Sequence, residues 1–118
     1  MSKKAILIHN PRCSKSREAK EILETEGIEF EVVDYLKDGL KEKLLLNLPR
    51  LLSLSYAEMI RTKEDTFKNL NLEIKQITDE QWIKILLSNP ILLERPIFIY
   101  GEKAVIARPA NLIYSLIK

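Results

Sequence analysis

The only cysteine and the only histidine of this 118-residue chain lie together in the stretch His9–Arg17, "HNPRCSKSR". The thiolate is the reactive form of cysteine. Its pKa falls from about 8.5 to roughly 3.5–7.5 at the start of a helix and beside cations. A helix is predicted from Ser14, so Cys13 meets the first condition. The stretch also supplies three cations and two hydroxyl groups: Arg12, Lys15, Arg17, Ser14 and Ser16. We therefore predict a reactive thiol at Cys13; an inert buried cysteine is the alternative.

The loop around Cys13 is also suited to an anion, because unpaired backbone N–H groups at a helix start attract negative charge. A nucleophile in such a loop suggests attack on a tetrahedral oxyanion. His9 ends the preceding strand, and its ring is expected either to stabilise the thiolate or to shuttle a proton. A lone cysteine excludes an internal disulfide, a CxxC redox pair and a zinc knuckle, and no metal site is predicted.

Three arginines elsewhere in the chain are candidates for holding that anion, because a guanidinium group offers several donors in a planar fork. Arg95 and Arg108 each precede a proline, in "ERPI" and "ARPA", and Arg61 ends the short helix "SYAEMIR". Taken one at a time, such charges are more often solvated surface groups. If the third strand of the sheet pairs with the first, the loop before the third strand lies beside the end of the first, and Arg95 would face Cys13. The peptide bond to Pro96 is a candidate for the cis form.

Hydrophobic periodicity predicts the elements that must position these residues. The apolar run "AILIH" suits a buried strand, and "EFEVVDYL" suits a second strand. Between them, Ala19, Ile22 and Leu23 follow helical spacing, and Gly27 is a natural C-terminal cap. The predicted bounds are 4–9 and 29–34 for the strands and 14–26 for the helix. Together they form a βαβ unit, which implies a parallel pairing of the strands.

The middle of the chain reads as helical. A leucine-rich segment covers 40–52, with Pro49 marking a break or the start of a new turn. Capping boxes at Ser55–Glu58 and Thr78–Gln81 open two further helices. The polar segment between those two boxes is predicted to hold a short helix with loops.

The last third of the chain predicts a hairpin and a helix. "PIFIY" and "KAVIA" are joined by Gly101-Glu102, and Pro109 starts a helix that runs to the last residue. The order is βαβ, a helical insert, then ββα. This order predicts an α/β, thioredoxin-like fold with a four-stranded mixed sheet in one domain, residues 1–118. A generic α+β sandwich is the alternative.

Composition narrows the class of function. The chain is 46% hydrophobic and 31% charged, as in ordinary globular proteins. Its 19 basic and 17 acidic side chains give no field for nucleic acid or a membrane surface. No apolar run reaches the ~20 residues of a membrane span, and the N-terminal run is too short for a secretory signal. We expect a cytoplasmic protein, because a lone cysteine suits a reducing compartment, and we expect a monomer.

The motifs "HNPRCSKSR", "IRTKED", "ERPIF" and "ARP", in this order and spacing, resemble the arsenate reductase (ArsC) family of the glutaredoxin-coupled type. The resemblance covers essentially the whole chain. It implies an oxidoreductase of arsenic detoxification in which Cys13 forms a covalent thiolate–arsenate adduct. Glutathione then attacks the adduct, glutaredoxin accepts the mixed disulfide, and arsenic leaves as arsenite. No bound cofactor is implied, since glutathione is a co-substrate.

The resemblance also implies roles for the residues around the thiol. Arg61, Arg95 and Arg108 match the arginines that hold the oxyanion. His9 and Ser16 match residues that help set the pKa and the orientation of the thiol. We expect three more residues to support this site: Asn10, Arg17 and Pro96.

Two other functions remain open at this point. The first is a thiol oxidoreductase that acts on glutathione mixed disulfides or on another oxyanion. The second is a non-enzymatic, redox-sensing regulator that binds RNA polymerase. Regulators of this superfamily often carry a CxxC motif, whereas this chain has Ser16 in place of the second cysteine, which argues against the regulator.

Overall fold

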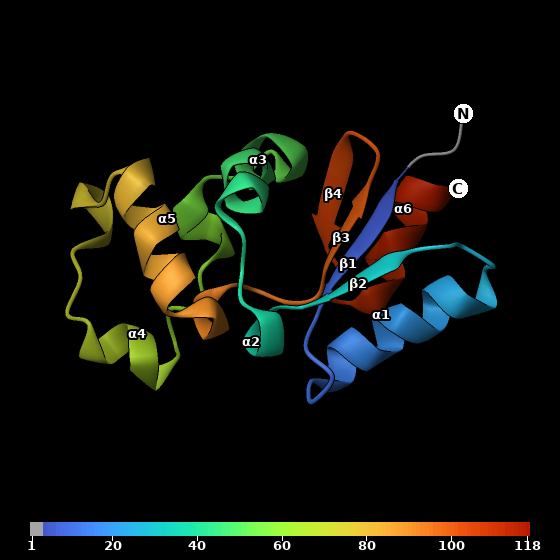
Figure 1. The fold of residues 1–118 in the computed structure, drawn as a ribbon, viewed down its shortest axis with the longest axis horizontal. Coiled ribbons are helices and arrows are strands. Elements are labelled where there is room, and N and C mark those ends of the chain that lie inside the picture. The colour runs from blue at the N-terminus through green and yellow to red at the C-terminus, as the bar shows by residue number, and fades with distance from the viewer. Residues whose placement is uncertain (1–3) are drawn as a thin grey trace.

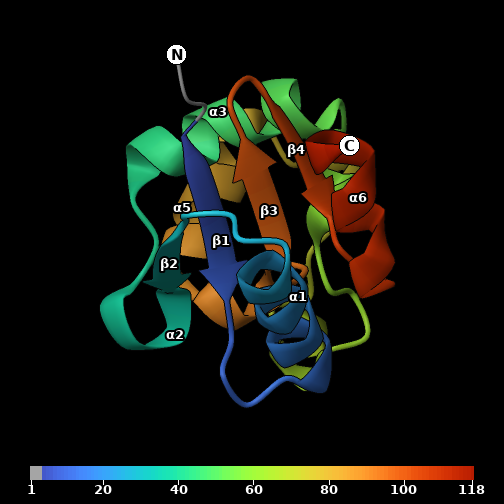
Figure 2. The same ribbon diagram turned by 90° about the vertical axis from the view of Figure 1, so that its right-hand side faces the viewer.

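The computed structural model, which describes residues 4–118, contains one sheet of four strands in the order β2-β1-β3-β4 (Figure 2). The strands are β1 (Ala5–His9), β2 (Glu31–Asp34), β3 (Ile97–Tyr100) and β4 (Lys103–Ile106). β1 pairs with β2 in parallel, and His9 lies opposite Asp34. β3 is antiparallel to both β1 and β4. The predicted βαβ unit, hairpin and mixed sheet are therefore confirmed.

Helices cover both faces of this sheet (Figures 1 and 2). α1 and α6 lie on one face, and α3 and α5 lie on the other. The α-helices are α1 (Ser14–Thr25), α2 (Tyr35–Asp38), α3 (Glu42–Leu52), α4 (Asp65–Asn69), α5 (Asp79–Ser88) and α6 (Tyr114–Ile117). Residues 4–118 also contain four 3₁₀-helices: η1 (Tyr56–Met59), η2 (Ile74–Gln76), η3 (Pro90–Leu92) and η4 (Ala110–Ile113). Within residues 4–118, none of the helices has the length and apolar character needed to span a bilayer.

The sheet divides the hydrophobic core into two layers, because successive side chains of a strand point to opposite faces. Ile8 and Ile97 pack against the helical segment from α2 to η3. Leu7 and Phe98 pack on the other side, against α1 and the C-terminal helices. His9, two residues after Leu7, therefore faces α1.

The sequence predicted either a break or the start of a new turn at Pro49, whereas the structure places Pro49 inside the continuous helix α3. Proline lacks the N–H that would bond the carbonyl of Leu45, four residues earlier. The hydroxyl of the buried Tyr56 donates to that carbonyl oxygen instead, at 2.6 Å. A side chain from η1 thus satisfies the acceptor that Pro49 leaves free in α3.

Three other boundaries differ from the prediction. Only Tyr56–Met59 of the "SYAEMIR" segment is helical, so Arg61 lies two residues beyond the helix that it was expected to end. The short helix α2 directly after β2 was not predicted. The C-terminal segment begins as 3₁₀-helix at Ala110 and becomes α-helix at Tyr114, rather than forming one helix from Pro109.

Candidate functional site

Hydrogen bonds within the loop between β1 and α1 fix its conformation. The N–H of Cys13 donates to the carbonyl of Asn10 at 2.9 Å, and the N–H of Arg12 donates to the Oδ1 atom of Asn10 at 3.0 Å. The carbonyl of Cys13 then accepts the first helical bond, from Arg17, at 3.1 Å. Cys13 is the N-cap residue of α1, which is the position predicted from the sequence.

Ser16 links this loop to the thiol. Its side chain is fully buried, and its Oγ atom accepts a hydrogen bond from the backbone N–H of Asn10 at 3.3 Å. A hydroxyl can accept and donate at the same time, so its own proton stays free for the sulfur of Cys13. Asn10 is itself buried, and it supports the site through these contacts.

The surroundings of Cys13 favour the thiolate. Burial alone would raise the pKa of the thiol, but the backbone N–H groups of Ser16 and Lys15, the Ser16 hydroxyl and the charge of Arg108 outweigh it. The net result is a thiol pKa below its ordinary value. Cys13 is also partly exposed, so a reactant can reach the sulfur. These two conditions are those of a reactive cysteine rather than an inert one.

Arg108 comes from the far end of the chain to the thiol. Its Nη1 atom lies 4.0 Å from the Sγ atom of Cys13 and 3.2 Å from the carbonyl oxygen of Arg95. The peptide bonds Arg95-Pro96 and Arg108-Pro109 are both cis. Arg95 lies two residues before Ile97, which pairs with Ile8 near the end of β1, and Arg108 contacts Arg95. Both arginines therefore lie at the end of β1 from which the loop of Cys13, here called the reactive loop, emerges.

The guanidinium group of Arg95 has donors that the protein does not use. Its Nε and Nη1 atoms are buried and have no hydrogen-bond partner among the residues described. A buried donor without an acceptor costs free energy, and a charged one costs more. An oxyanion would supply the acceptors, so this arginine suits an anion site.

Arg61 is placed differently from the other two arginines. Its Nη1 atom lies 2.9 Å from the Oε1 atom of Glu64, and its Nε atom lies 3.5 Å from the Oε1 atom of Glu94. Two carboxylates therefore already balance its charge. Its link to Cys13 is indirect, because the charges of both residues act on the phenol of Tyr35.

His9, the last residue of β1, is buried on the face of the sheet that α1 covers. Its Nδ1 atom has no hydrogen-bond partner within residues 4–118. Burial and the nearby charge of Lys20 lower its pKa, against the opposing effects of Asp34 and the Ser16 backbone. The imidazole is therefore neutral near pH 7, and it brings no positive charge to the thiolate. A role in moving a proton is still compatible with this position.

Tyr35 is a buried residue near Cys13 and Arg61 that the sequence did not single out. It begins α2 directly after β2, and its side chain is 1% exposed. Burial raises the pKa of its phenol; Arg61 opposes this effect, and Cys13, Glu94 and Asp34 add to it. The available signal was its place at the end of β2, because neighbouring parallel strands end at the same edge of a sheet.

The other predicted residues lie around this centre. Pro96 is buried at the start of β3. Arg17 is exposed on α1, and Lys15 pairs with Glu18 at 3.8 Å. The structure thus brings Cys13 together with Ser16 and Arg108, whereas Arg17 points to solvent. In the part of the chain that the structure describes, no group of three or more metal-ligating side chains occurs.

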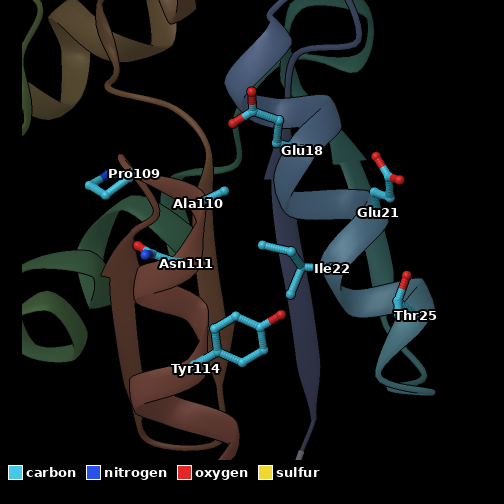
Figure 3. Close-up of a pocket in the computed structure, with 8 residues that line it drawn as sticks. All are labelled: Glu18, Glu21, Ile22, Thr25, Pro109, Ala110, Asn111 and Tyr114. Carbon is cyan, nitrogen blue, oxygen red and sulfur yellow. The ribbon is translucent and has the colours of Figure 1, made fainter.

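The structure has a groove between α1 and residues 109–114, and a separate cavity beside the loop that carries Cys13. A groove of about 470 Å³ runs along α1, with Glu18 and Glu21 on one wall and Tyr114 on the other (Figure 3). Its two carboxylates would repel an oxyanion. A second cavity, of about 400 Å³, lies between the loop and α2 and carries two cations, Arg12 and Lys37.

The sequence and the fold of this chain are similar to those of known proteins. The model of the ArsC family matches residues 8–115. The uncharacterized protein YfgD of Escherichia coli (strain K12) is 40% identical over 118 residues, which is 99% of each chain. An arsenate reductase of Neisseria meningitidis serogroup B is 38% identical over 112 residues, 94% of this chain and 96% of the relative. A solved structure of an arsenate reductase from Vibrio cholerae superposes with a TM-score of 0.91 at 33% identity, over 98% of this chain and 99% of that one.

Proposed function

The chain belongs to the ArsC family, and from this premise we propose that it reduces arsenate to arsenite with electrons from glutathione and glutaredoxin. One observation carries the proposal. The thiol with a lowered pKa at the start of α1 lies beside the guanidinium of Arg108, which also donates to the backbone carbonyl of Arg95, a residue whose buried side-chain donors lack acceptors within residues 4–118. A nucleophile and an anion site therefore coincide.

In the first step, the thiolate of Cys13 attacks the arsenic atom of arsenate. A sulfur–arsenic bond forms, and one arsenic–oxygen bond breaks. The departing oxygen takes up one proton from solvent and leaves as water, so arsenic remains pentavalent. Arg95 and Arg108 stabilise the negative charge on the remaining oxygens, because a guanidinium group can donate two parallel hydrogen bonds to an oxyanion.

In the second step, the thiolate of glutathione attacks the sulfur of Cys13. A disulfide forms between the two sulfurs, and the electron pair of the sulfur–arsenic bond passes to arsenic. Arsenic becomes trivalent and leaves as arsenite. A thiolate of glutaredoxin then attacks the mixed disulfide and takes over the glutathionyl group, which regenerates Cys13.

The lone cysteine supports an external source of electrons. Two thiols must be oxidised to a disulfide for each arsenate reduced, and this chain contains one. Glutathione is a small thiol that keeps the cytoplasm reducing. We therefore place the protein there, acting as a monomer with exchangeable partners.

A thiol oxidoreductase that acts only on glutathione mixed disulfides is a weaker candidate. Its substrate is a disulfide, which has no tetrahedral oxyanion. The carboxylates of glutathione lie several bonds away from its sulfur, whereas an oxyanion attacked by Cys13 brings acceptor oxygens directly to the thiol and the neighbouring Arg108. The arginines of the site thus favour an oxyanion.

The test is arsenate turnover by the purified protein with glutathione and glutaredoxin. We expect arsenite formation by the wild-type protein and none by Cys13→Ser, whose hydroxyl is a far weaker nucleophile. Equal rates for the two proteins would overturn the proposal. Arsenite formation without glutaredoxin would overturn only the assignment of the electron source.

A further inference from the structure

Tyr35, the first residue of α2, lies close enough to Cys13 for the two groups to interact electrostatically. Asp34, the residue before it, is the register partner of His9, so the start of α2 lies next to the start of the Cys13 loop. The ring of Tyr35 belongs to the core layer that also holds Ile8. The ring thus packs among apolar side chains, while the charges of Arg61, Cys13, Glu94 and Asp34 act on the hydroxyl group.

The Tyr35 hydroxyl has no hydrogen-bond partner within the described residues, although it is buried. Buried tyrosine hydroxyl groups usually find one. Four buried side-chain atoms lack a partner within residues 4–118, and they belong to His9, Tyr35 and Arg95. All three residues lie at the edge of the sheet where β1 ends, at the reactive loop.

Another buried tyrosine of the same core layer behaves in the ordinary way. The hydroxyl of Tyr56 donates to the carbonyl of Leu45 at 2.6 Å. The fold can thus satisfy a buried phenol where the phenol is only structural. The contrast with Tyr35 points to an acceptor supplied by a ligand.

The charges near Tyr35 agree with a donor role. Burial keeps the phenol protonated, and the charges of Cys13 and Glu94 act in the same direction. A protonated phenol offers one O–H donor.

We propose that the hydroxyl of Tyr35 donates a hydrogen bond to the oxyanion that binds at Cys13, which makes Tyr35 a substrate-binding residue alongside Arg95 and Arg108. The inference rests on the proposed function for the nature of the ligand. It concerns binding, not electron transfer, so it can be tested without turnover.

The two roles of a buried hydroxyl predict opposite effects of its removal. If the Tyr35 hydroxyl is structural, Tyr35→Phe lowers stability. If it is held for a ligand, Tyr35→Phe removes an unpaired polar group from the core, so stability stays equal or rises while oxyanion binding weakens. Tyr56→Phe is the matched control, because it deletes the same atom from the same core layer.

The experiment measures protection of Cys13 from alkylation by iodoacetamide at increasing arsenate concentration, without any reductant. It also measures the urea midpoint of each protein. We expect Tyr35→Phe to require about ten- to a hundredfold more arsenate for half-protection, with a midpoint no lower than that of the wild type. Tyr56→Phe should show the reverse: wild-type protection and a lower midpoint.

Equal protection of Tyr35→Phe and the wild type would overturn the inference. So would a wild-type Cys13 that arsenate does not protect at all, because Tyr35 would then have no ligand. If arsenate protects the wild type but is never reduced to arsenite, the proposed function fails and the inference about Tyr35 stands.

Discussion

The Nη1 atom of Arg108 lies 4.0 Å from the Sγ atom of Cys13, although the two residues are separated by 95 positions in the chain. The contact joins the loop after β1 to the residues that follow β4. It brings a charge that favours the thiolate to the same atom that must attack the substrate. One side chain therefore contributes both to the binding of an oxyanion and to the activation of the nucleophile.

Arg108→Ala should lower kcat/KM for arsenate by about ten- to a hundredfold, because a hydrogen bond to a charged group contributes about 1.5–3 kcal/mol. Steady-state kinetics with glutathione and glutaredoxin would measure this. Arg50→Ala is a suitable control, since Arg50 is an exposed arginine that pairs with Glu102 on the surface. An enzyme specific for mixed disulfides would lose little activity with either variant, and that result would contradict the oxyanion assignment.

Ser16→Ala should raise the pKa of the Cys13 thiol. The substitution removes a hydroxyl that lowers this pKa, and it leaves the N–H of Asn10 without its acceptor. The rate of iodoacetamide alkylation as a function of pH reports the thiolate fraction. Ser14→Ala, at an exposed position of the same helix, should leave the profile unchanged. An unshifted profile for Ser16→Ala would show that the Ser16 hydroxyl does not contribute to the low pKa of the thiol.

Part of the stability of the protein should be lost in mild acid through His9. Its pKa in the folded state lies below the ordinary value of 6.5 because the ring is buried. The unfolded chain therefore binds more protons between the folded-state pKa and 6.5. The contribution is fully present above 6.5, and it is lost as the pH falls through the folded-state pKa.

Urea unfolding between about pH 7 and pH 5 would measure this effect. The free energy of unfolding of the wild-type protein should fall over that range more steeply than that of His9→Gln, which has no imidazole to protonate. Parallel pH profiles for the two proteins would mean that His9 titrates alike in the folded and unfolded states.

Tyr56→Phe should destabilise the protein by about 1–3 kcal/mol, because it leaves the buried carbonyl of Leu45 unpaired. The cost should shrink in the background of Pro49→Ala, where residue 49 regains an N–H that can bond this carbonyl. A double-mutant cycle measured by urea unfolding isolates that coupling. If Tyr56→Phe lowers the free energy of unfolding equally in both backgrounds, the Tyr56 hydroxyl does not replace the missing N–H of residue 49.

The local patterns of the sequence predicted most of the fold. Apolar runs and helical spacing located all four strands and α1, because their periods reflect which face is buried. The capping box at Thr78 marked the start of α5, and the N–H of Gln81 does donate to the Oγ1 atom of Thr78. The prediction of a break or a new turn at Pro49 was wrong because of a contact with a residue outside α3. The missing donor of Pro49 is replaced by a tyrosine seven residues later, beyond the reach of a local rule.

The site was predictable only where chemistry is local. Cys13 and Ser16 lie within one turn of helix, and the helix start and the cationic neighbours could be read directly. Tyr35 and the pairing of Arg61 with Glu94 arise from segments that meet only after folding, so no spacing encodes them. Likewise, the burial that keeps His9 neutral comes from the packing of α1 on the sheet.

The bond between Tyr56 and Leu45 has a consequence for sequence variation in the family. The tyrosine hydroxyl is needed only while residue 49 lacks an N–H, since an ordinary residue there would satisfy the carbonyl of Leu45 within α3. Relatives without proline at this position are free to replace the tyrosine by an apolar residue. The two positions should therefore change together during evolution, although both lie away from the reactive thiol.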